Sequence, residues 1–279
     1  MFDMTLCIIW RNNNTVHMAA DSRLSFGSAR ADIAIKISRE YYSIRGADQG
    51  ANRGAVIADG DVAFCFAGSG SGSVFMKESL SGILGELQAV PGWHGVSFAD
   101  TAGLIFEAYK IITLRLTAAI FDAGFVDLVV AGLCPVQGDY RTFICKTKVI
   151  KSGEGATQEH TLTEVLSDQP SHMFIGNGAP SARTKVDALG RSPTSRDLLR
   201  ILKEVIDDPT VPGVGGAIQY GFFDKTTFAT RGILEVTPGD DVDPSQIHYW
   251  RGALDLRDQA FEDKFGISYP MIALDEFFP

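Results

Sequence analysis

The chain has 279 residues, of which 45% are hydrophobic and 21% are charged, a balance typical of a globular protein and not of a disordered one. Its 34 acidic residues outnumber its 25 basic residues, so the formal net charge is −9. A net negative surface repels phosphate backbones, and no run of basic residues offsets it, which argues against nucleic acid as a partner.

The four cysteines lie far apart within apolar stretches and form no C-x-x-C pair, so they predict buried thiols in a reducing compartment. They are Cys7, Cys65, Cys134 and Cys145. The first four residues have neither the basic nor the apolar region of a secretory signal. The most apolar segment, 104–120, contains three charged residues, which argues against a membrane span. We therefore expect a cytoplasmic protein with no membrane association.

The first part of the chain predicts strands. Apolar runs at 6–10 and 15–20 flank an asparagine-rich turn, a pattern that predicts a hairpin of two buried strands. Further strands are predicted at 33–38 and 62–67. The glycine-bearing segment between them is predicted to be mostly loop, with a short strand near 55–57.

Helices and strands then alternate in blocks. One helix opens at the Gly/Ser-rich run 68–73 and ends before Pro91-Gly92, and a second spans about 98–119. A later helix spans about 178–189, and another ends near 206, because Thr194 followed by Asp197 forms a capping-box pattern. The remaining predicted strands are 125–133, 139–146, 160–166, 172–175, 217–223 and 228–235.

Paired helices between blocks of hairpin-linked strands indicate an α+β fold in which helices cover antiparallel sheets. A four-layer αββα sandwich fits this order, although periodicity alone does not single it out. We find no repeat or linker, and assign residues 1–236 to one domain. Residues 237–279, acidic and aromatic without a clear period, form a C-terminal extension expected to pack on that domain or on a neighbouring subunit.

More specific motifs occupy the first seventy residues. Thr5 begins the first apolar run, and Asp21-Ser22-Arg23 ends the second, so that Asp21 lies sixteen positions after Thr5. Lys36 lies between two isoleucines, and Ala67-Gly68-Ser69-Gly70 closes the fourth predicted strand. In this order the motifs resemble the opening of proteasome β-subunits and bacterial proteasome-like peptidases, a family of N-terminal nucleophile (Ntn) hydrolases.

The resemblance implies an Ntn-hydrolase fold over about residues 5–235 and a threonine-type peptidase or amidase. In it Thr5 is the nucleophile, Lys36 the electrostatic activator and Asp21 the residue that orients Lys36. A threonine hydroxyl needs a base, and the α-amine of an N-terminal threonine, which titrates near pH ~8, can serve. Considered alone, without the resemblance, Thr5 is typical of a strand residue and Asp21 is typical of a residue that caps a turn.

Further positions follow from the same resemblance. The loop of Gly68, Ser69 and Gly70 would line the active site, with the Gly70 N–H as a donor to the oxyanion. Ser22 and Asn177 are supporting residues, and Asn177 stands where the family has the serine that positions the amine. The same Gly/Ser run, at the start of a helix, is also compatible with anion binding. It lacks the Lys-Ser/Thr ending of a P-loop, which argues against a nucleotide site.

The chemistry requires Thr5 to be the first residue of the mature chain, and four residues precede it here. Self-cleavage after Met4 would expose it. Translation starting at Met4, followed by aminopeptidase removal of that methionine, is the simpler route.

Two other positions depart from the family pattern. Val214 replaces a second serine, and Val211 stands where an aspartate is expected, with Asp207 or Asp208 as substitutes if the loop is shifted. These departures and the leader leave a second hypothesis open: a catalytically inactive, proteasome-like structural or assembly subunit. A non-peptide amidase on the same fold is a third.

The histidines show no metal-ligand spacing, so we expect no metal and no cofactor. The expected partners are a peptide or amide substrate and, from the resemblance, further copies of the chain in a ring or related homo-oligomer. An ATP-dependent unfoldase is a possible additional partner. The sequence does not reveal the substrate.

Overall fold

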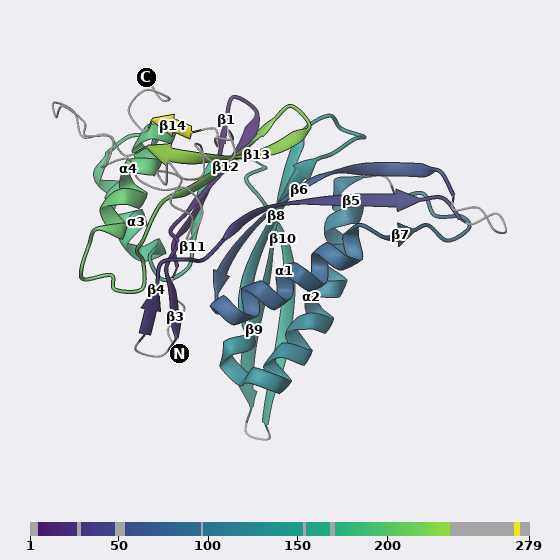
Figure 1. The fold of residues 1–279 in the computed structure, drawn as a ribbon, viewed down its shortest axis with the longest axis horizontal. Helices are drawn as coiled ribbons and strands as arrows, with labels where there is room; N and C mark the ends of the chain where they lie inside the picture. The colour runs from purple at the N-terminus through teal and green to yellow at the C-terminus, as the bar shows by residue number, and fades with distance from the viewer. Residues whose placement is uncertain are drawn as a thin grey trace, which may run out of the picture.

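The computed structural model describes residues 5–26, 29–47, 54–95, 97–152, 155–167, 171–234 and 271–273. Within these residues, two six-stranded sheets lie between two pairs of helices (Figure 1). Sheet I consists, in spatial order, of β11 (His172–Ile175), β1 (Cys7–Asn12), β2 (Thr15–Ala20), β12 (Gln219–Asp224), β13 (Thr227–Leu234) and β14 (Met271–Ala273). Sheet II consists of β10 (Gly155–Val165), β9 (Tyr140–Ser152), β8 (Val126–Leu133), β6 (Val56–Gly68), β5 (Ile37–Arg45) and β7 (Leu87–Gln88).

In the part of the chain that the structure describes, four helices form the outer layers. α1 (Gly70–Leu84) and α2 (Phe98–Ile120) cover sheet II, whereas α3 (Ala179–Ala188) and α4 (Ser195–Ile206) cover sheet I (Figure 1). A short 3-10 helix, η1 (Phe121–Gly124), follows α2, and a small hairpin of β3 (Leu24–Phe26) and β4 (Ala29–Ala31) stands apart from both sheets. The predicted αββα sandwich is therefore confirmed.

Alternation along the central strands builds three apolar layers. In β1, Ile8 packs toward α3 and α4, while its neighbour Ile9 packs toward sheet II. In β6, Phe64 packs toward α1 and α2, while Cys65 lies between the sheets. Because successive strand side chains point to opposite faces, strands buried on both faces read as continuous apolar runs.

Two local predictions are confirmed in detail. Asn13 and Asn14 connect β1 to β2 with φ values of 46° and 66°, the left-handed conformations that a two-residue hairpin turn requires. At the start of α4, Thr194 Oγ1 accepts from the Asp197 N–H, and the Asp197 carboxylate accepts from the Thr194 N–H at 2.8 Å. This is the capping box that the sequence predicted.

The prediction of a strand over 33–38 is wrong for its first half, because β5 begins only at Ile37. Ala34 and Lys36 are still buried while Ile33 and Ile35 are half exposed, as in an extended segment. The N–H groups of Ala34 and Lys36, however, donate to a loop carbonyl and to a side chain, whereas the Lys36 carbonyl accepts from a strand, β6.

The prediction that the region before residue 62 is mostly loop is also wrong. β5 and β6 form a long antiparallel hairpin whose pairing runs from Ile37↔Cys65 to Arg45↔Val56. The first helix ends at Leu84, earlier than predicted, and the short strand β7 follows it. Most of the proposed C-terminal extension lies outside the described residues; β14 within it pairs in parallel with β13.

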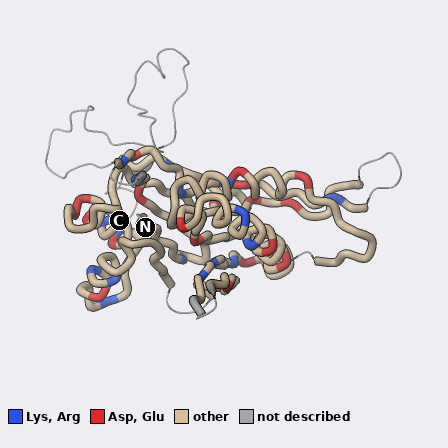
Figure 2. The backbone as a smooth tube through the Cα atoms, turned by 90° about the horizontal axis from the view of Figure 1, so that it is seen from below, with Lys and Arg blue, Asp and Glu red and all other residues tan. Residues whose placement is uncertain are grey.

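Charged residues are spread over the described chain, with Asp and Glu interspersed among Lys and Arg (Figure 2). Within the same residues, no helix has both the length and the apolarity needed to cross a membrane.

Candidate active site

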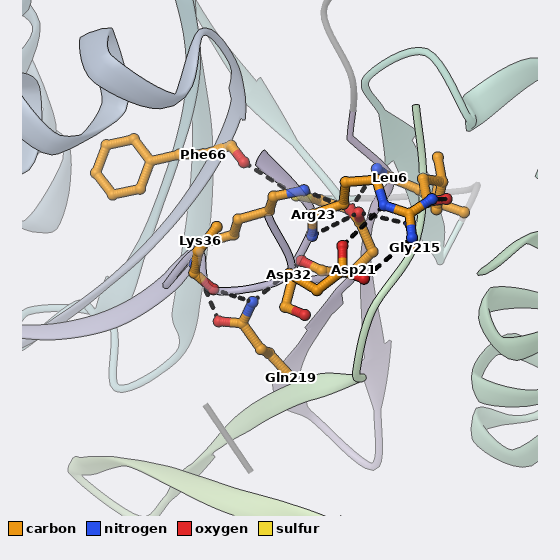
Figure 3. Close-up of polar contacts among 12 residues, drawn as sticks. Leu6, Asp21, Arg23, Asp32, Lys36, Phe66, Gly215 and Gln219 are labelled. Atoms are coloured by element: carbon orange, nitrogen blue, oxygen red, sulfur yellow. Dashed lines mark hydrogen bonds and ion pairs between the residues drawn. The ribbon is translucent and has the colours of Figure 1, made fainter. Parts of the chain in front are cut away.

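The carboxylate of Asp21, directly after β2, is the centre of a buried polar cluster (Figure 3). Its Oδ1 accepts from the Leu6 N–H at 2.9 Å and from Lys36 Nζ at 2.6 Å. Its Oδ2 accepts from the backbone N–H groups of Arg23 at 3.2 Å and Gly215 at 3.1 Å. Asp21 is 0% exposed, so these four bonds replace the water that an ionised carboxylate needs.

Thr5 is held from the opposite side by the turn between β11 and α3. The Thr5 carbonyl accepts from the Gly178 N–H at 3.1 Å. Gly176 has φ of +89°, and a Cβ there would lie 2.2 Å from the Thr5 oxygen, so only glycine fits against this residue. Asn177 sits between the two glycines with its side chain exposed. The turn and the Asp21 carboxylate together fix the backbone of Thr5 and Leu6.

Lys36 reaches the cluster from the segment before β5 and is 4% exposed. Its carbonyl accepts from the Phe66 N–H at 2.9 Å, which ties it to β6, and its N–H donates to Gln219 Oε1 at 3.0 Å. The structure therefore brings Lys36, Asp21 and the residue after Thr5 together, although they come from three different segments.

Ser22 supports the loop before β12. Its Oγ accepts from the Ala217 N–H at 2.9 Å, and its N–H donates to the Gly215 carbonyl at 3.1 Å. Gly216 has φ of +77°, and a Cβ there would lie 2.3 Å from Ser22 Oγ. This packing aims the Gly215 N–H at Asp21.

Arg23 also stabilises the loop before β12. Its guanidinium forms a bidentate ion pair with Asp32, with N–O distances of 2.8 and 3.0 Å, and donates to the Val214 carbonyl at 3.1 Å. A Cβ on Gly215 would lie 2.1 Å from the guanidinium carbon, so this position needs glycine as well.

The glycine-bearing loop after β6 has a mixed role. Ser69 is the N-cap of α1, with its Oγ accepting from the Gly72 N–H at 3.2 Å, and its own N–H donates to Phe125 O at 3.1 Å. The Ser69 amide is thus already bonded. Gly68 takes φ of +119°, and Gly70 packs directly under Leu24, three residues after Asp21. Leu24 thereby links this loop to the Asp21 segment.

The positions that depart from the family pattern are not compensated by the suggested aspartates. Val214 is 1% exposed and belongs to the apolar layer under α3 and α4, and Val211 packs against it. Asp207 pairs with Lys203 at 2.6 Å, and Asp208 accepts from the N–H of Thr210 at 2.8 Å. Both carboxylates are bound within their own segment.

Cys7 lies beside the cluster, and its Sγ donates to the Phe66 carbonyl at 3.2 Å. Burial, and then Cys65, raise the pKa of the Cys7 thiol well above its ordinary value. A thiol that stays protonated is a poor nucleophile, so this environment does not favour Cys7 as one. Across the described residues, His, Cys, Asp and Glu form no group of three or more able to hold a metal ion.

Sequence reasoning did not identify Gln219, the Arg23–Asp32 pair or the Gly215 amide. Gln219 had a usable signal, because it is a polar residue within the apolar strand predicted at 217–223. The Gly215 amide binds a partner 194 residues away and has no local signal, whereas Arg23 and Asp32 are nine residues apart and carry opposite charges that the sequence analysis did not pair.

Two mostly antiparallel sheets between two pairs of helices form a proteasome-like sandwich fold, and a buried lysine–aspartate pair lies beside the start of the first strand. The solved structures similar to this chain agree. Anbu from Hyphomicrobium sp. strain MC1, as a Gly-1 mutant, matches with a TM-score of 0.54 and 15% identity over 85% of this chain and 89% of that chain. Anbu from Yersinia bercovieri, described as an ancestral beta-subunit, matches with a TM-score of 0.54 and 15% identity over 81% and 86%.

The helical assembly of the Anbu complex from Pseudomonas aeruginosa matches with a TM-score of 0.50 and 15% identity, covering 85% of this chain and 88% of that chain. No protein-family model matches the sequence, and no curated protein matches it. At this identity the similarity establishes the fold and leaves the activity to be argued from the site.

Proposed function

We propose that this chain is a threonine-nucleophile peptidase or amidase of the proteasome type, active once residues 1–4 are removed. One observation carries the proposal: a single Asp21 carboxylate oxygen binds both the amide directly after Thr5 and the Lys36 ammonium. The lysine that would act on the nucleophile and the strand that carries the nucleophile are therefore held by the same atom.

In the first half-reaction the free α-amine of Thr5 takes the proton of its own hydroxyl, and Oγ attacks the carbonyl carbon of an amide bond. The resulting tetrahedral intermediate collapses as its C–N bond breaks, and the proton held by the amine passes to the leaving amine. An ester on Thr5 Oγ remains. The Lys36 ammonium favours the neutral form of the amine and the negative charge that develops on Oγ.

In the second half-reaction the Thr5 amine takes a proton from water, and the hydroxide attacks the ester carbonyl. Collapse of the second intermediate releases the acid and returns the proton to Oγ. A backbone N–H of the loop 68–70 is the proposed donor to the oxyanion in both steps. Since the Ser69 amide already donates to Phe125, Gly70 remains the preferred donor.

The intact mass of protein expressed from its native message, with N-terminal sequencing, tests the first requirement. A chain beginning at Thr5 supports the proposal, and a chain that keeps Met1 or Met4 contradicts it. The second test is a peptide epoxyketone, a probe that must react with both a hydroxyl and a free amine. Mass spectrometry should locate one adduct, at Thr5.

Matched variants make the second test specific. Thr5→Ser keeps a hydroxyl beside the amine and should still form the adduct, whereas Thr5→Ala should not. Thr15→Ala, at the far end of the same hairpin, should react like the wild type.

The surroundings of the site are part of the proposal. We place it in the cytoplasm, acting on peptide or amide bonds, with an ATP-dependent unfoldase as a possible partner. Because the Anbu complex of Pseudomonas aeruginosa forms a helical assembly, we also propose that this chain forms a homo-oligomer. Light scattering coupled to size-exclusion chromatography tests this, and a monomer at micromolar concentration would contradict it.

One observation favours the second candidate function, an inactive structural or assembly subunit. Val214 is an apolar residue at a position where the family has a serine. It packs against Gly178, whose N–H donates to the Thr5 carbonyl. A chain that begins at Thr5, forms an oligomer and yet fails to react with the epoxyketone would establish this alternative.

A further inference from the structure

Gln219, the first residue of β12, is 2% exposed, and its side-chain amide makes three hydrogen bonds (Figure 3). Nε2 donates to the Asp21 carbonyl at 3.0 Å and to the Ala34 carbonyl at 2.8 Å. Oε1 accepts from the Lys36 N–H at 3.0 Å. Both amide protons and the carbonyl oxygen are thus used, as a buried amide requires.

The bonds join two segments that no strand pairing connects among the described residues. Gln219 is paired with Ala20 at the end of β2, in sheet I. Ala34 and Lys36 precede β5, in sheet II. Because Tyr220 packs toward α3 and α4, the neighbouring Gln219 points into the space between the sheets. Its side chain therefore bonds the two segments where β2 ends and β5 begins, as backbone groups do between paired strands.

Together with the bond from the Ala34 N–H to the Ser22 carbonyl at 2.8 Å, this position helps to set how far apart the backbones of Asp21 and Lys36 lie. Their side chains form the 2.6 Å ion pair, and a long, flexible lysine keeps one geometry only if its backbone is fixed. Gln219 binds the backbone of both partners and neither of their charged groups, so it contributes no charge of its own.

We infer that Gln219 is a positioning residue that sets the Lys36 ammonium against Asp21 and, through it, beside the proposed nucleophile. The inference rests on the proposed function for its catalytic consequence and on contacts alone for its structural part. No other common side chain of this length supplies two donors and one acceptor. Gln219→Met keeps the volume and removes all three bonds, while Gln219→Glu keeps the shape and removes both donors.

A displaced Lys36 has a signature that loss of stability alone does not produce. Since a nearby positive charge disfavours protonation of an amine, moving the ammonium away raises the pKa of the Thr5 amine. The acid limb of the pH profile should then move to higher pH. The rate should also fall by roughly 10–100-fold at neutral pH, the loss expected for a group misplaced by about 1 Å.

The experiment measures epoxyketone adduct formation by full-length, processed protein from about pH 6 to pH 9, a range that brackets the ordinary pKa of an α-amine. Wild type, Gln219→Met, Gln219→Glu and Tyr109→Phe are compared. Tyr109 is the control, because its buried hydroxyl donates to Val126 O at 2.7 Å on the helix side of sheet II, among the residues that pack against α1 and α2. Removing it should lower stability and leave the pH profile unchanged.

Crystal structures of wild type and Gln219→Met provide a readout that does not depend on activity. We expect the Nζ–Oδ1 separation, 2.6 Å with Gln219 present, to exceed hydrogen-bond distance in the variant. An unchanged separation overturns the inference whether or not the protein is an enzyme, whereas an unreactive wild type with a lengthened separation in the variant overturns only the proposed function. An unshifted pH profile in reactive Gln219 variants also overturns the inference that Gln219 is a positioning residue. So does failure of both Gln219 variants to fold when Tyr109→Phe folds, because the role is then structural only.

Discussion

Replacing Asp21 by asparagine should be among the most destabilising single changes of similar size in this protein. The substitution keeps the shape and removes the charge, so the buried Lys36 ammonium loses its carboxylate. It also introduces an NH2 donor at a position where the native carboxylate only accepts hydrogen bonds. Asp21 accepts from four donors, and an asparagine in its place turns at least one of those contacts into donor against donor.

Breaking a buried ion pair by removing one partner costs about 3–5 kcal/mol, and we expect Asp21→Asn to fall in this range. Lys36→Met should cost less. The remaining carboxylate still accepts from the backbone N–H groups of Leu6, Arg23 and Gly215. The double variant should cost about 1–3 kcal/mol less than the sum of the two single changes, as expected for residues in direct contact.

Urea unfolding of the four proteins at neutral pH, followed by circular dichroism, measures all three quantities if the transitions are two-state. Equal m-values would show that the changes act on stability and not on the unfolded ensemble. Two outcomes would refute the reasoning. One is additivity within error, which would mean that the pair does not exist in solution. The other is a Lys36→Met variant less stable than Asp21→Asn, which would mean that the carboxylate depends on the lysine more than on the backbone.

Three further predictions concern the rest of the fold. Burial lowers the pKa of His17 to about 4, so the unfolded chain takes up its proton first as pH falls; the free energy of unfolding should drop by up to about 3 kcal/mol between pH 6.5 and 4, and His17→Phe should flatten this slope in urea titrations. Burial raises the pKa of Cys7, and raises that of Cys145 to about 12, so iodoacetamide at pH 8 should label neither thiol until urea unfolds the protein, as peptide mass spectrometry can verify. A Cβ on Gly178 would lie 2.8 Å from two side-chain carbons, so Gly178→Ala should cost about 1–3 kcal/mol by thermal unfolding, whereas Gly82→Ala in α1, with open space around it, should cost nothing.

Much of the fold could be predicted because its elements carry local signals. The turn at Asn13 and Asn14 and the capping box at Thr194 can each be predicted from a few adjacent residues. The hairpin of β5 and β6 could not be predicted in the same way. In its outer half, residues 56–60 of β6 are exposed or partly exposed, so their pattern resembles a loop, although Tyr42, Ser43 and Ile44 of β5 are buried. Pairing with β5 supplies the order that the pattern of β6 lacks.

The candidate site divides along the same line. Thr5, Asp21 and Lys36 could be proposed because their order along the chain resembles a known family, and the structure brings Asp21 and Lys36 into contact. The contacts of the residues that hold them could not be proposed. Gln219 is noticeable as a polar residue in an apolar strand, but its partners and that of Gly215 lie 180 residues or more away in sequence, and such contacts exist only in the folded chain.

The two halves of the ion pair do not have equal claims to a structural role. Asp21 has one without any lysine, because it satisfies three backbone N–H groups that would otherwise be buried and unpaired. Lys36 adds a charge that had to be removed from water, and a buried ion pair is commonly no more stabilising than apolar residues of the same volume. The fold thus explains the aspartate better than it explains the lysine. Under the proposed function, Lys36 is retained for its effect on the amine and hydroxyl of Thr5. A Lys36→Met protein that folds well and reacts poorly would separate the catalytic role from the structural one.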